Sequence, residues 1–361
     1  MRTINKTSNE AGEGIERQPR NPEPINVTFF KRKTRPIGNF SLEFIFDDVR
    51  TQLKPLVSAT TVTAPYYSNG LFRRLAICFH AMWNQAKRHA VNHVTGDTTF
   101  TTIGLRSKQT VLTILDCGVL AQKRGLKRWL IKKIWFDWPV RRAKAVTTIS
   151  SSVRKEIIEL TDCNPDKIRV VPVAVSQKFI RSERPLTNPP RIMHLGNAPN
   201  KNLPRLIEAL EGIECTLVVI GKLDPSITEL VSKHGIDFEN HYNLPWDDVI
   251  QMYVNCDMVA FVSTYEGFGM PIVEANAVGR PVITSNISSM PEVAGDAACL
   301  VDPFDVEAIR AGIQRIINDS SYRESLIEKG YENAKRFHPE KIAHMYLDVY
   351  REVANSLNSS K

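Results

Sequence analysis

The chain has 361 residues, a length that fits two domains better than one, and its hydrophobic content of 42% allows each domain to bury a core. No apolar run approaches the roughly 18 residues that a membrane-spanning helix needs. The six cysteines are scattered and form no Cys-x-x-Cys pair. This argues against a disulfide framework or a zinc site and favours a reducing, cytoplasmic setting.

The net charge of +8 is unevenly distributed along the chain. Residues 1–185 contain 32 Lys and Arg against 15 Asp and Glu, whereas residues 186–361 contain 15 against 24. The basic first half favours anionic partners such as phosphates, acidic lipids or nucleic acid. It fits equally well with a solvated surface of mixed charge.

Expected strands and helices alternate along the chain. Residues 1–25 are polar, without the apolar core of a signal peptide, and we expect them to be disordered. The sequence then predicts strands at 25–30, 91–94, 110–115, 145–149 and 168–171, and helices at 41–53, 71–87, 126–138 and 150–160. Residues 184–190 contain three prolines and have the composition of a linker. Beyond it we expect strands at 191–195, 215–220, 258–262, 281–284 and 299–301, and helices at 203–210, 247–254, 271–278 and from 305 to 356.

Strands that alternate with helices predict parallel sheets flanked by helices. Two such runs separated by a linker indicate an α/β fold with two Rossmann-like, doubly wound domains that face a cleft, over residues 26–183 and 191–338. In such sheets, ligands bind beyond the carboxyl ends of the strands.

One segment directly after an expected strand combines the features of a ligand site. It reads Glu266-Gly267-Phe268-Gly269-Met270-Pro271-Ile272-Val273-Glu274. Its two glycines allow the backbone to turn and to approach a ligand closely. The proline begins the next helix, whose first N–H groups form a natural site for a pyrophosphate. The second glutamate lies one turn further on, where it can accept hydrogen bonds from a ribose diol.

This pattern resembles the signature of glycosyltransferase family 4, whose members are retaining enzymes with the two-domain GT-B fold. Segments 191–203, 286–293 and 300–303 are similar to other parts of that family. Segments 92–97 and 113–116 resemble a branch often found in bacterial surface-polysaccharide assembly. The resemblance covers roughly residues 26–350 and is strongest in the second half.

The resemblance implies roles for individual residues. Glu266 contacts hydroxyls of the transferred sugar, Lys201 neutralises the leaving nucleoside diphosphate, and Glu274 binds the ribose. The remaining donor-binding residues that it implies are Gly38, Asn39, Gly196, Asn197, Gly267, Phe268, Gly269, Met270 and Pro271. It also implies that a final helix, within residues 339–361, packs back on the first domain.

The implied function is retaining transfer of a hexosyl unit from a nucleotide-sugar donor to a glycan or polyprenyl-pyrophosphate-linked acceptor. The chain has no Asp-x-Asp, and because Lys201 and helix dipoles can replace a metal, we expect neither a metal nor another cofactor. No nucleic-acid-binding module is recognisable, so no nucleic-acid partner is expected. No Gly-x-Gly-x-x-Gly follows the first strand, which argues against a nicotinamide dehydrogenase.

Two positions depart from the family pattern. This branch carries His before Asp116, where the chain has Leu115, and many members carry Arg after Gly196, where the chain has Asn197. A leucine neither donates nor accepts a hydrogen bond, and one missing charged contact weakens donor binding by about 1.5–3 kcal/mol. The departures motivate an alternative, a catalytically weak member that serves as a non-catalytic partner of another transferase.

Three further side chains have more than one interpretation. Asp116 is a candidate acceptor-side base and, equally, a candidate cap for the turn after its strand. His93 is a candidate for the missing imidazole, but structural contacts at a strand end are favoured. His194 lies in an expected strand, and we expect it to be packed there rather than catalytic.

A basic segment, residues 123–144, contains Trp129, Trp135 and Trp138. Positive charge together with tryptophan suits peripheral contact with an anionic membrane. Because the apolar and basic positions do not separate on a helical wheel, we expect the tryptophans to pack in the core and only the lysines and arginines to contact lipid. This contact would hold the enzyme near a lipid-linked acceptor at the inner face of the membrane.

Overall fold

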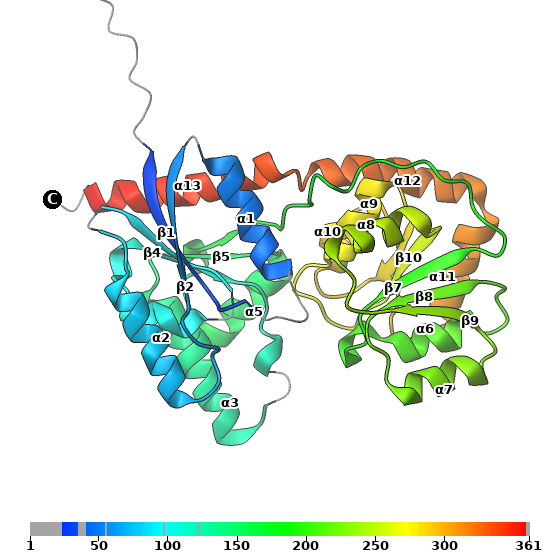
Figure 1. Cartoon of the computed structure of the whole chain (residues 1–361), viewed down its shortest axis with the longest axis horizontal. Helices are drawn as coiled ribbons and strands as arrows, with labels where there is room; N and C mark the ends of the chain where they lie inside the picture. Colours follow the sequence, from blue (N-terminus) through cyan, green and yellow to red (C-terminus); the bar gives the residue numbers. More distant parts are fainter. Residues whose placement is uncertain are drawn as a thin grey trace, which may run out of the picture.

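The structure, a computed structural model, describes residues 24–34, 41–54, 56–87, 89–96, 98–120 and 123–358. Two six-stranded parallel sheets lie side by side, each flanked by helices (Figure 1). The predicted α/β class with two doubly wound units is therefore confirmed. Residues 1–23 of the stretch expected to be disordered lie outside the described residues, and so do Gly38 and Asn39.

The first sheet has the strand order β2-β1-β3-β4-β5-β6. Its strands are β1 (Ile25–Lys31), β2 (Val57–Thr63), β3 (Val91–Val94), β4 (Thr110–Ile114), β5 (Ala145–Thr148) and β6 (Ile168–Val170). Helices α1 (Ser41–Leu53) and α13 (Pro339–Asn358) share one buried cluster with this sheet. Helices α2 (Leu71–Trp83) and α5 (Ser151–Thr161) and the π-helical segment η4 (Lys132–Asp137) pack on the other face. The helix α13 thus crosses back from the second half of the chain to cover the first sheet (Figure 1).

The second sheet has the order β12-β11-β10-β7-β8-β9. Its strands are β7 (Arg191–Leu195), β8 (Thr216–Ile220), β9 (Asp237–His241), β10 (Met258–Phe261), β11 (Val282–Ser285) and β12 (Cys299–Val301). One face is covered by α8 (Trp246–Asn255), α9 (Met270–Val278) and α10 (Met290–Ala294). The other is covered by α6 (Leu203–Leu210), α7 (Pro225–Lys233) and α11 (Val306–Asn318), and α12 (Ser320–Lys335) lies along α9.

The two halves share one buried apolar cluster. Ile149 and Val173 from the first half pack together with Phe261, Phe268 and Ile272 from the second. Burial of apolar surface across this boundary holds the carboxyl ends of the two sheets close to each other. The candidate site at the end of β10 therefore lies where both halves meet.

Most predicted elements are present, but β2, α7, β9 and α10 are missing from the sequence prediction. The strand β2 consists largely of Ser, Thr and Ala and is mostly exposed at the sheet edge, so it lacks the apolar alternation of a half-buried strand. The helix expected at 126–138 is divided into α3 (Gly125–Ile131), η4 and the start of α4 (Trp138–Arg142). Among the described residues, no helix is long and apolar enough to cross a membrane.

Candidate active site

The segment Glu266 to Gly269 connects β10 to α9, as the strand–turn–helix pattern predicts. The strand β10 lies between β11 and β7, where the strand order of the sheet reverses. In doubly wound sheets this switch point is the usual place for a ligand. Gly269 has φ of 112° immediately before α9, a left-handed conformation that favours glycine, and no side chain caps the first turn of the helix. The first N–H groups of α9 are therefore without a side-chain cap in the described structure.

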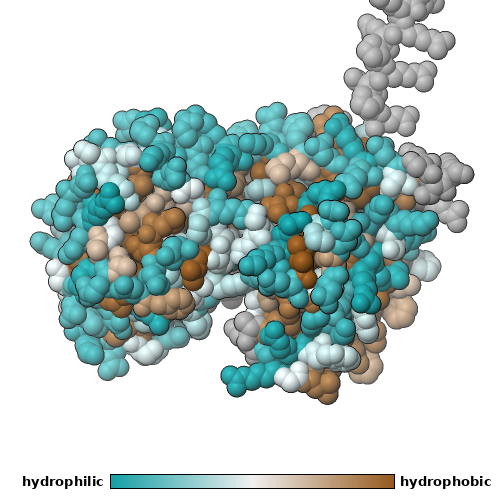
Figure 2. Space-filling model, turned by 180° about the vertical axis from the view of Figure 1, so that it is seen from behind, coloured by the Kyte–Doolittle hydropathy of each residue, from teal (hydrophilic) through white to brown (hydrophobic). Residues whose placement is uncertain are grey.

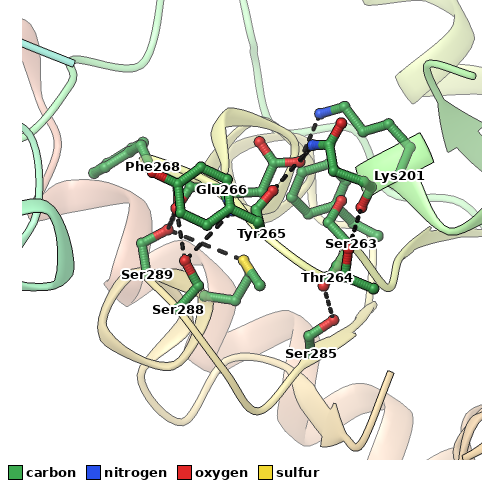
Figure 3. A network of polar contacts seen from close by, with 12 residues as sticks. Lys201, Ser263, Thr264, Tyr265, Glu266, Phe268, Ser285, Ser288 and Ser289 are labelled. Carbon is green, nitrogen blue, oxygen red and sulfur yellow. Dashed lines mark hydrogen bonds and ion pairs between the residues drawn. The ribbon is translucent and has the colours of Figure 1, made fainter. Parts of the chain in front are cut away.

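Lys201 and Glu266 point toward each other from neighbouring strand ends (Figure 3). Lys201 lies in the short 3-10 turn η6 (Pro199–Lys201) after β7, and its Nζ is 2.7 Å from Oε1 of Glu266. The same ammonium group lies 4.8 Å from the centre of the Phe261 ring. Both charged side chains are largely buried, so water screens their attraction less than it would at an exposed surface. The two residues to which the family resemblance gives roles toward the sugar and the diphosphate are thus in direct contact.

Asn200 fastens the loop of η6 to the end of β10. Its carbonyl oxygen accepts a 2.8 Å hydrogen bond from the N–H of Thr264, and its side-chain Nδ2 donates to the carbonyl oxygen of Tyr265 at 3.0 Å. These bonds set the distance between the loops that carry Lys201 and Glu266. No local pattern predicts this role of Asn200, because its partners lie 64 and 65 residues further along the chain.

Two serines after β11 hold the glycine-containing loop from the other side (Figure 3). Oγ of Ser288 donates to the carbonyl oxygen of Glu266 at 2.8 Å, and Oγ of Ser289 donates to that of Phe268 at 2.7 Å. The loop is therefore held by side chains from a neighbouring strand connection, which restricts the motion of its backbone. The sequence placed both serines in a family-like segment but gave them no function.

The side chain of Lys201 runs close to Gly196, where it leaves little space for a Cβ atom. It has φ of 89°, and a Cβ atom at this position would lie 3.1 Å from Cγ of Lys201. The next residue, Asn197, is exposed, and its side-chain amide donates to the carbonyl oxygen of Lys222. Asn197 therefore connects two loops at the end of the second sheet.

Glu274 is buried rather than open to solvent. It is 5% exposed, and its Oε2 accepts a hydrogen bond of 2.5 Å from the hydroxyl of Tyr253. Burial raises the pKa of Glu274 to about 7, while the Tyr253 hydrogen bond and the charge of Lys201 act in the opposite direction. Binding of ribose by this carboxylate stays a prediction. It requires that a ligand reach Glu274 through the first turn of α9.

Asp116 and Leu115 approach the site from the first half. The Oδ1 atom of Asp116 accepts a 2.9 Å hydrogen bond from the N–H of Gly118, so this carboxylate does cap its turn, as one of the two interpretations held. Its role as a base stays a prediction. The side chain of Leu115 packs against the apolar cluster shared by the two halves. A Cβ atom on Gly267 would lie only 2.4 Å from the carbonyl oxygen of Leu115, so this close approach requires a glycine.

Hydrogen bonds join the two halves around the site. The hydroxyl of Tyr265 donates to Oε2 of Glu156 at 2.9 Å and accepts from the N–H of Cys117 at 3.2 Å. Oγ of Ser150 donates to the carbonyl oxygen of Gly267 at 2.8 Å. Burial is the main cause that raises the pKa of Glu156. The sequence offered no signal for these partners, because each pair spans more than 100 residues of the chain.

His93 and His194 are structural, as favoured from the sequence. The ring of His93 is fully buried, with Nδ1 2.8 Å from the hydroxyl of Tyr350 and Nε2 2.7 Å from Oγ1 of Thr113. Burial, with a smaller effect of the Arg50 charge, lowers the pKa of His93 to about 3. His194 is buried in β7 with Nδ1 3.0 Å from the carbonyl oxygen of Ala260, and burial lowers its pKa to about 4. Both rings are buried inside their sheets, so neither replaces the imidazole that is missing at position 115.

The three tryptophans of the basic segment differ in their environments. Trp135 packs as expected, with its ring 5.2 Å from that of Phe100. Trp129 and Trp138 are 53% and 49% exposed, so core packing is wrong for both. The π-helical segment η4 changes the number of residues per turn, so residues before and after it do not continue one buried stripe.

Comparisons with known proteins agree with this geometry. Residues 176–333, which include Lys201 and Glu266, match the family described as glycosyl transferases group 1. The chain is 32% identical over 231 residues to O-antigen chain mannosyltransferase B of Escherichia coli, covering 58% of this chain and 61% of that protein. It is 27% identical over 227 residues to MMP alpha-(1->4)-mannosyltransferase of Mycolicibacterium hassiacum, covering 59% of this chain and 55% of that protein. The chain thus spans less than two thirds of the length of these relatives.

Solved structures show the same fold over nearly the whole chain. Sucrose-phosphate synthase from Thermosynechococcus elongatus superposes with a TM-score of 0.75 at 16% identity, covering 91% of this chain and 99% of that one. WaaG, a glycosyltransferase involved in lipopolysaccharide biosynthesis, superposes with a TM-score of 0.68 at 17% identity, covering 90% and 99%. The chain therefore has the GT-B fold, and its residues 176–333 match the family of glycosyl transferases group 1.

Proposed function

We propose that the protein is a retaining glycosyltransferase that moves a hexosyl unit from a nucleotide sugar to a glycan or a polyprenyl-pyrophosphate-linked glycan. The observation that carries this proposal is the contact between Lys201 and Glu266 at the switch point of a group 1 domain. The similarity to mannosyltransferases favours mannose as the transferred sugar. The O-antigen relative favours cell-surface polysaccharide assembly, with the enzyme at the cytoplasmic face of the membrane.

In this proposal the donor separates the two site charges. Lys201 turns from Glu266 to the diphosphate and stabilises the negative charge that develops as the bond to the anomeric carbon breaks. The first turn of α9 supplies further N–H groups to the phosphates. Glu266, released from Lys201, accepts hydrogen bonds from sugar hydroxyls.

Retention of configuration is proposed to follow from attack of the acceptor hydroxyl on the face that the diphosphate leaves. A double displacement would need a carboxylate that is free to attack the anomeric carbon. In the proposed donor complex Glu266 is occupied by sugar hydroxyls, and Asp116 is held by the N–H of Gly118, which favours the front-face route. Lys201 and the α9 dipole supply positive charge to the diphosphate, so the proposed reaction needs no metal, and activity should survive EDTA.

The proposal is tested with the purified protein and a panel of nucleotide sugars, using lipid-linked oligosaccharides as acceptors and mass spectrometry to detect the product. We expect transfer with a guanosine- or uridine-activated hexose, and NMR of the product should show the anomeric configuration of the donor. Lys201→Met should abolish transfer, whereas the exposed Lys233→Met on α7 is the matched control that should not. An inverted product would contradict the retaining mechanism.

A non-catalytic partner of another transferase is the second candidate, favoured by the apolar Leu115 packed where the family branch carries histidine. Ligand binding to the native state raises thermal stability whether or not turnover follows. A nucleotide sugar that raises the melting temperature but is never turned over, with or without acceptor, would favour this candidate. No thermal response to any nucleotide sugar would contradict both.

A further inference from the structure

The outer face of α2 is apolar and exposed. Leu71, Phe72, Leu75, Phe79 and Trp83 all expose large side chains, with Phe72 86% and Trp83 91% accessible. Their spacing places them on one side of the helix, while Ile77 and Ala81 are buried on the opposite side. An amphipathic helix normally buries its larger apolar stripe, and α2 instead presents it to the exterior.

The short helix α3 continues this surface. None of the described residues of α3 is buried, and Leu126, Trp129 and Leu130 are all exposed. A cavity of about 640 Å³ lies between the two helices, with Leu71 on the α2 side and Leu130 on the α3 side. Both helices line this cavity, and we term their exposed residues together the α2/α3 surface. Helices α2 and α3 project from the same end of the first half in Figure 1.

All charges that the two segments bring to this surface are positive. The sequence has no Asp or Glu from residue 49 to 96 or from 117 to 136. Over the same stretches, α2, α3 and the residues directly before α3 contribute the basic side chains Arg73, Arg74, Lys123, Arg124, Lys127 and Arg128. Figure 2 shows hydrophobic and hydrophilic residues next to each other at the lower end of this half.

We propose that the α2/α3 surface docks on an anionic lipid bilayer, with its aromatic side chains at the level of the headgroups and its basic side chains on lipid phosphates. A bilayer accepts an apolar helix face together with positive charge and requires no complementary shape. A second copy of the chain fits less well, because a two-fold interface through this surface would bring its basic side chains opposite one another.

If the protein transfers a sugar as proposed, the cavity between α2 and α3 gives the docking a consequence for the acceptor. Besides Leu71 and Leu130, its lining includes Arg74, Lys127 and, at the carboxyl end of β4, Asp116. Docking turns the cavity between α2 and α3 toward the bilayer. The cavity reaches the loop that touches Gly267, so an amphiphilic acceptor can enter from the lipid and present its head group beside the donor.

Co-sedimentation with sucrose-loaded vesicles tests the docking without any transfer reaction. Vesicles of phosphatidylcholine alone are compared with vesicles that contain one third phosphatidylglycerol. We expect the protein to bind the anionic vesicles at least about 10-fold more tightly, and this preference should weaken as salt is raised. Bromolipids in the anionic vesicles should quench tryptophan fluorescence, and Trp83→Ser should reduce this quenching.

Two pairs of substitutions separate the apolar and the electrostatic contributions. Phe72→Ser with Trp83→Ser should lower binding to anionic vesicles by about 10-fold or more, since two exposed aromatic anchors are lost. Lys127→Glu with Arg128→Glu should lower it similarly and reduce its salt dependence. All four side chains are on exposed positions, so folding should be unaffected, which circular dichroism checks.

Matched controls lie on exposed positions elsewhere in the molecule. Phe304→Ser with Ile180→Ser removes two large exposed apolar side chains, and Lys233→Glu with Lys341→Glu reverses two exposed charges. Both controls should bind vesicles as the unchanged protein does.

Three results would overturn the proposal. They are no sedimentation with anionic vesicles, unchanged sedimentation of both surface variants, and a dimer in light scattering that Phe72→Ser with Trp83→Ser converts to a monomer. Vesicle binding without turnover of any nucleotide sugar would contradict the proposed function and leave the docking intact. Turnover of soluble substrates without vesicle binding would contradict the docking and leave the proposed function intact.

Discussion

The Nζ atom of Lys201 lies 2.7 Å from Oε1 of Glu266, so each charge of the candidate site is neutralised by the other. A ligand that takes Lys201 must compete with this carboxylate. Lys201→Met should therefore weaken the binding of both the free nucleoside diphosphate and the nucleotide sugar. The expected loss of affinity is roughly 10- to 100-fold, which corresponds to one charged hydrogen bond. Glu266→Gln should weaken the binding of the nucleotide sugar, because a contact to the sugar is changed. It should not weaken the binding of the free diphosphate, because the substitution also releases Lys201. Calorimetric titration of both ligands distinguishes the two variants, and equal losses for both ligands in Glu266→Gln would refute this division of roles.

Gly267→Ala should separate the two halves locally. The new Cβ would lie 2.4 Å from the carbonyl oxygen of Leu115, a backbone atom that can move only with its strand end. We expect a loss of stability of about 1–3 kcal/mol, as for overpacking, together with weaker transfer. Gly118→Ala is the milder comparison, since its Cβ would approach side-chain atoms of Asp116 and Tyr265 at 3.2 Å, and side chains can rotate. Chemical denaturation measures both, and a smaller effect for Gly267→Ala than for Gly118→Ala would contradict the argument.

Leu115→His tests the position where the family branch carries an imidazole. Leu115 packs against the apolar cluster that includes Phe268, so a polar ring should cost about 1–3 kcal/mol of folding free energy. Leu115→Met keeps the apolar contact and should cost less than about 1.5 kcal/mol. If this position still faces the sugar, turnover should change in the histidine variant only. Identical turnover in both variants would mean that position 115 has no contact with the reaction.

His93 should make the protein acid-sensitive. Burial lowers its pKa to about 3 in the folded state, against about 6.5 when unfolded. A proton therefore binds the unfolded chain more tightly, so the stability due to neutral His93 is complete above pH 6.5 and is lost as the pH falls toward 3. His93→Gln should lower the melting temperature at pH 7, because Tyr350 and Thr113 lose a partner, but should flatten its decline between pH 6.5 and 4. Parallel melting curves for the two proteins over this range would exclude a titrating role of His93.

Titration of Glu274 changes the stability of the protein with pH in the opposite direction to titration of His93. Burial raises its pKa to about 7, so the proton binds the folded chain more tightly, and the stability due to this group is present below pH 4.5 and lost as the pH rises through 7. Glu274→Gln should remove this loss. We expect a smaller decrease in the melting temperature between pH 5 and 8 for the variant than for the unchanged protein. An unchanged pH profile would show that Glu274 is already ionised in the folded state.

The sequence predicted those parts of the fold and site whose signal is local. The turn from β10 into α9 is an example, because the glycines and Pro271 specify it within a few residues. The roles of Ser150, Glu156 and Tyr265 were not predictable, since these side chains meet only when two halves of the chain close on each other.

Helical periodicity predicts where a helix lies but not which of its faces is buried. Periodicity predicts the helix at 71–87, but the pattern of residues cannot tell which side of α2 the domain covers. Phe72 and Trp83 are exposed while Ile77 and Ala81 are buried, and only the packed structure distinguishes these faces.

The return of α13 to the first sheet has a consequence for synthesis on the ribosome. Domains usually fold in the order in which they emerge. Here β1 to β6 emerge first, but the face that buries Tyr346 and Tyr350 is completed only when α13 follows the entire second half. During that interval the nascent first half must keep uncovered the part of this sheet face that α13 covers, and a fragment cut within 184–190 would have the same part exposed. Folding of this protein therefore finishes with the half that is translated first.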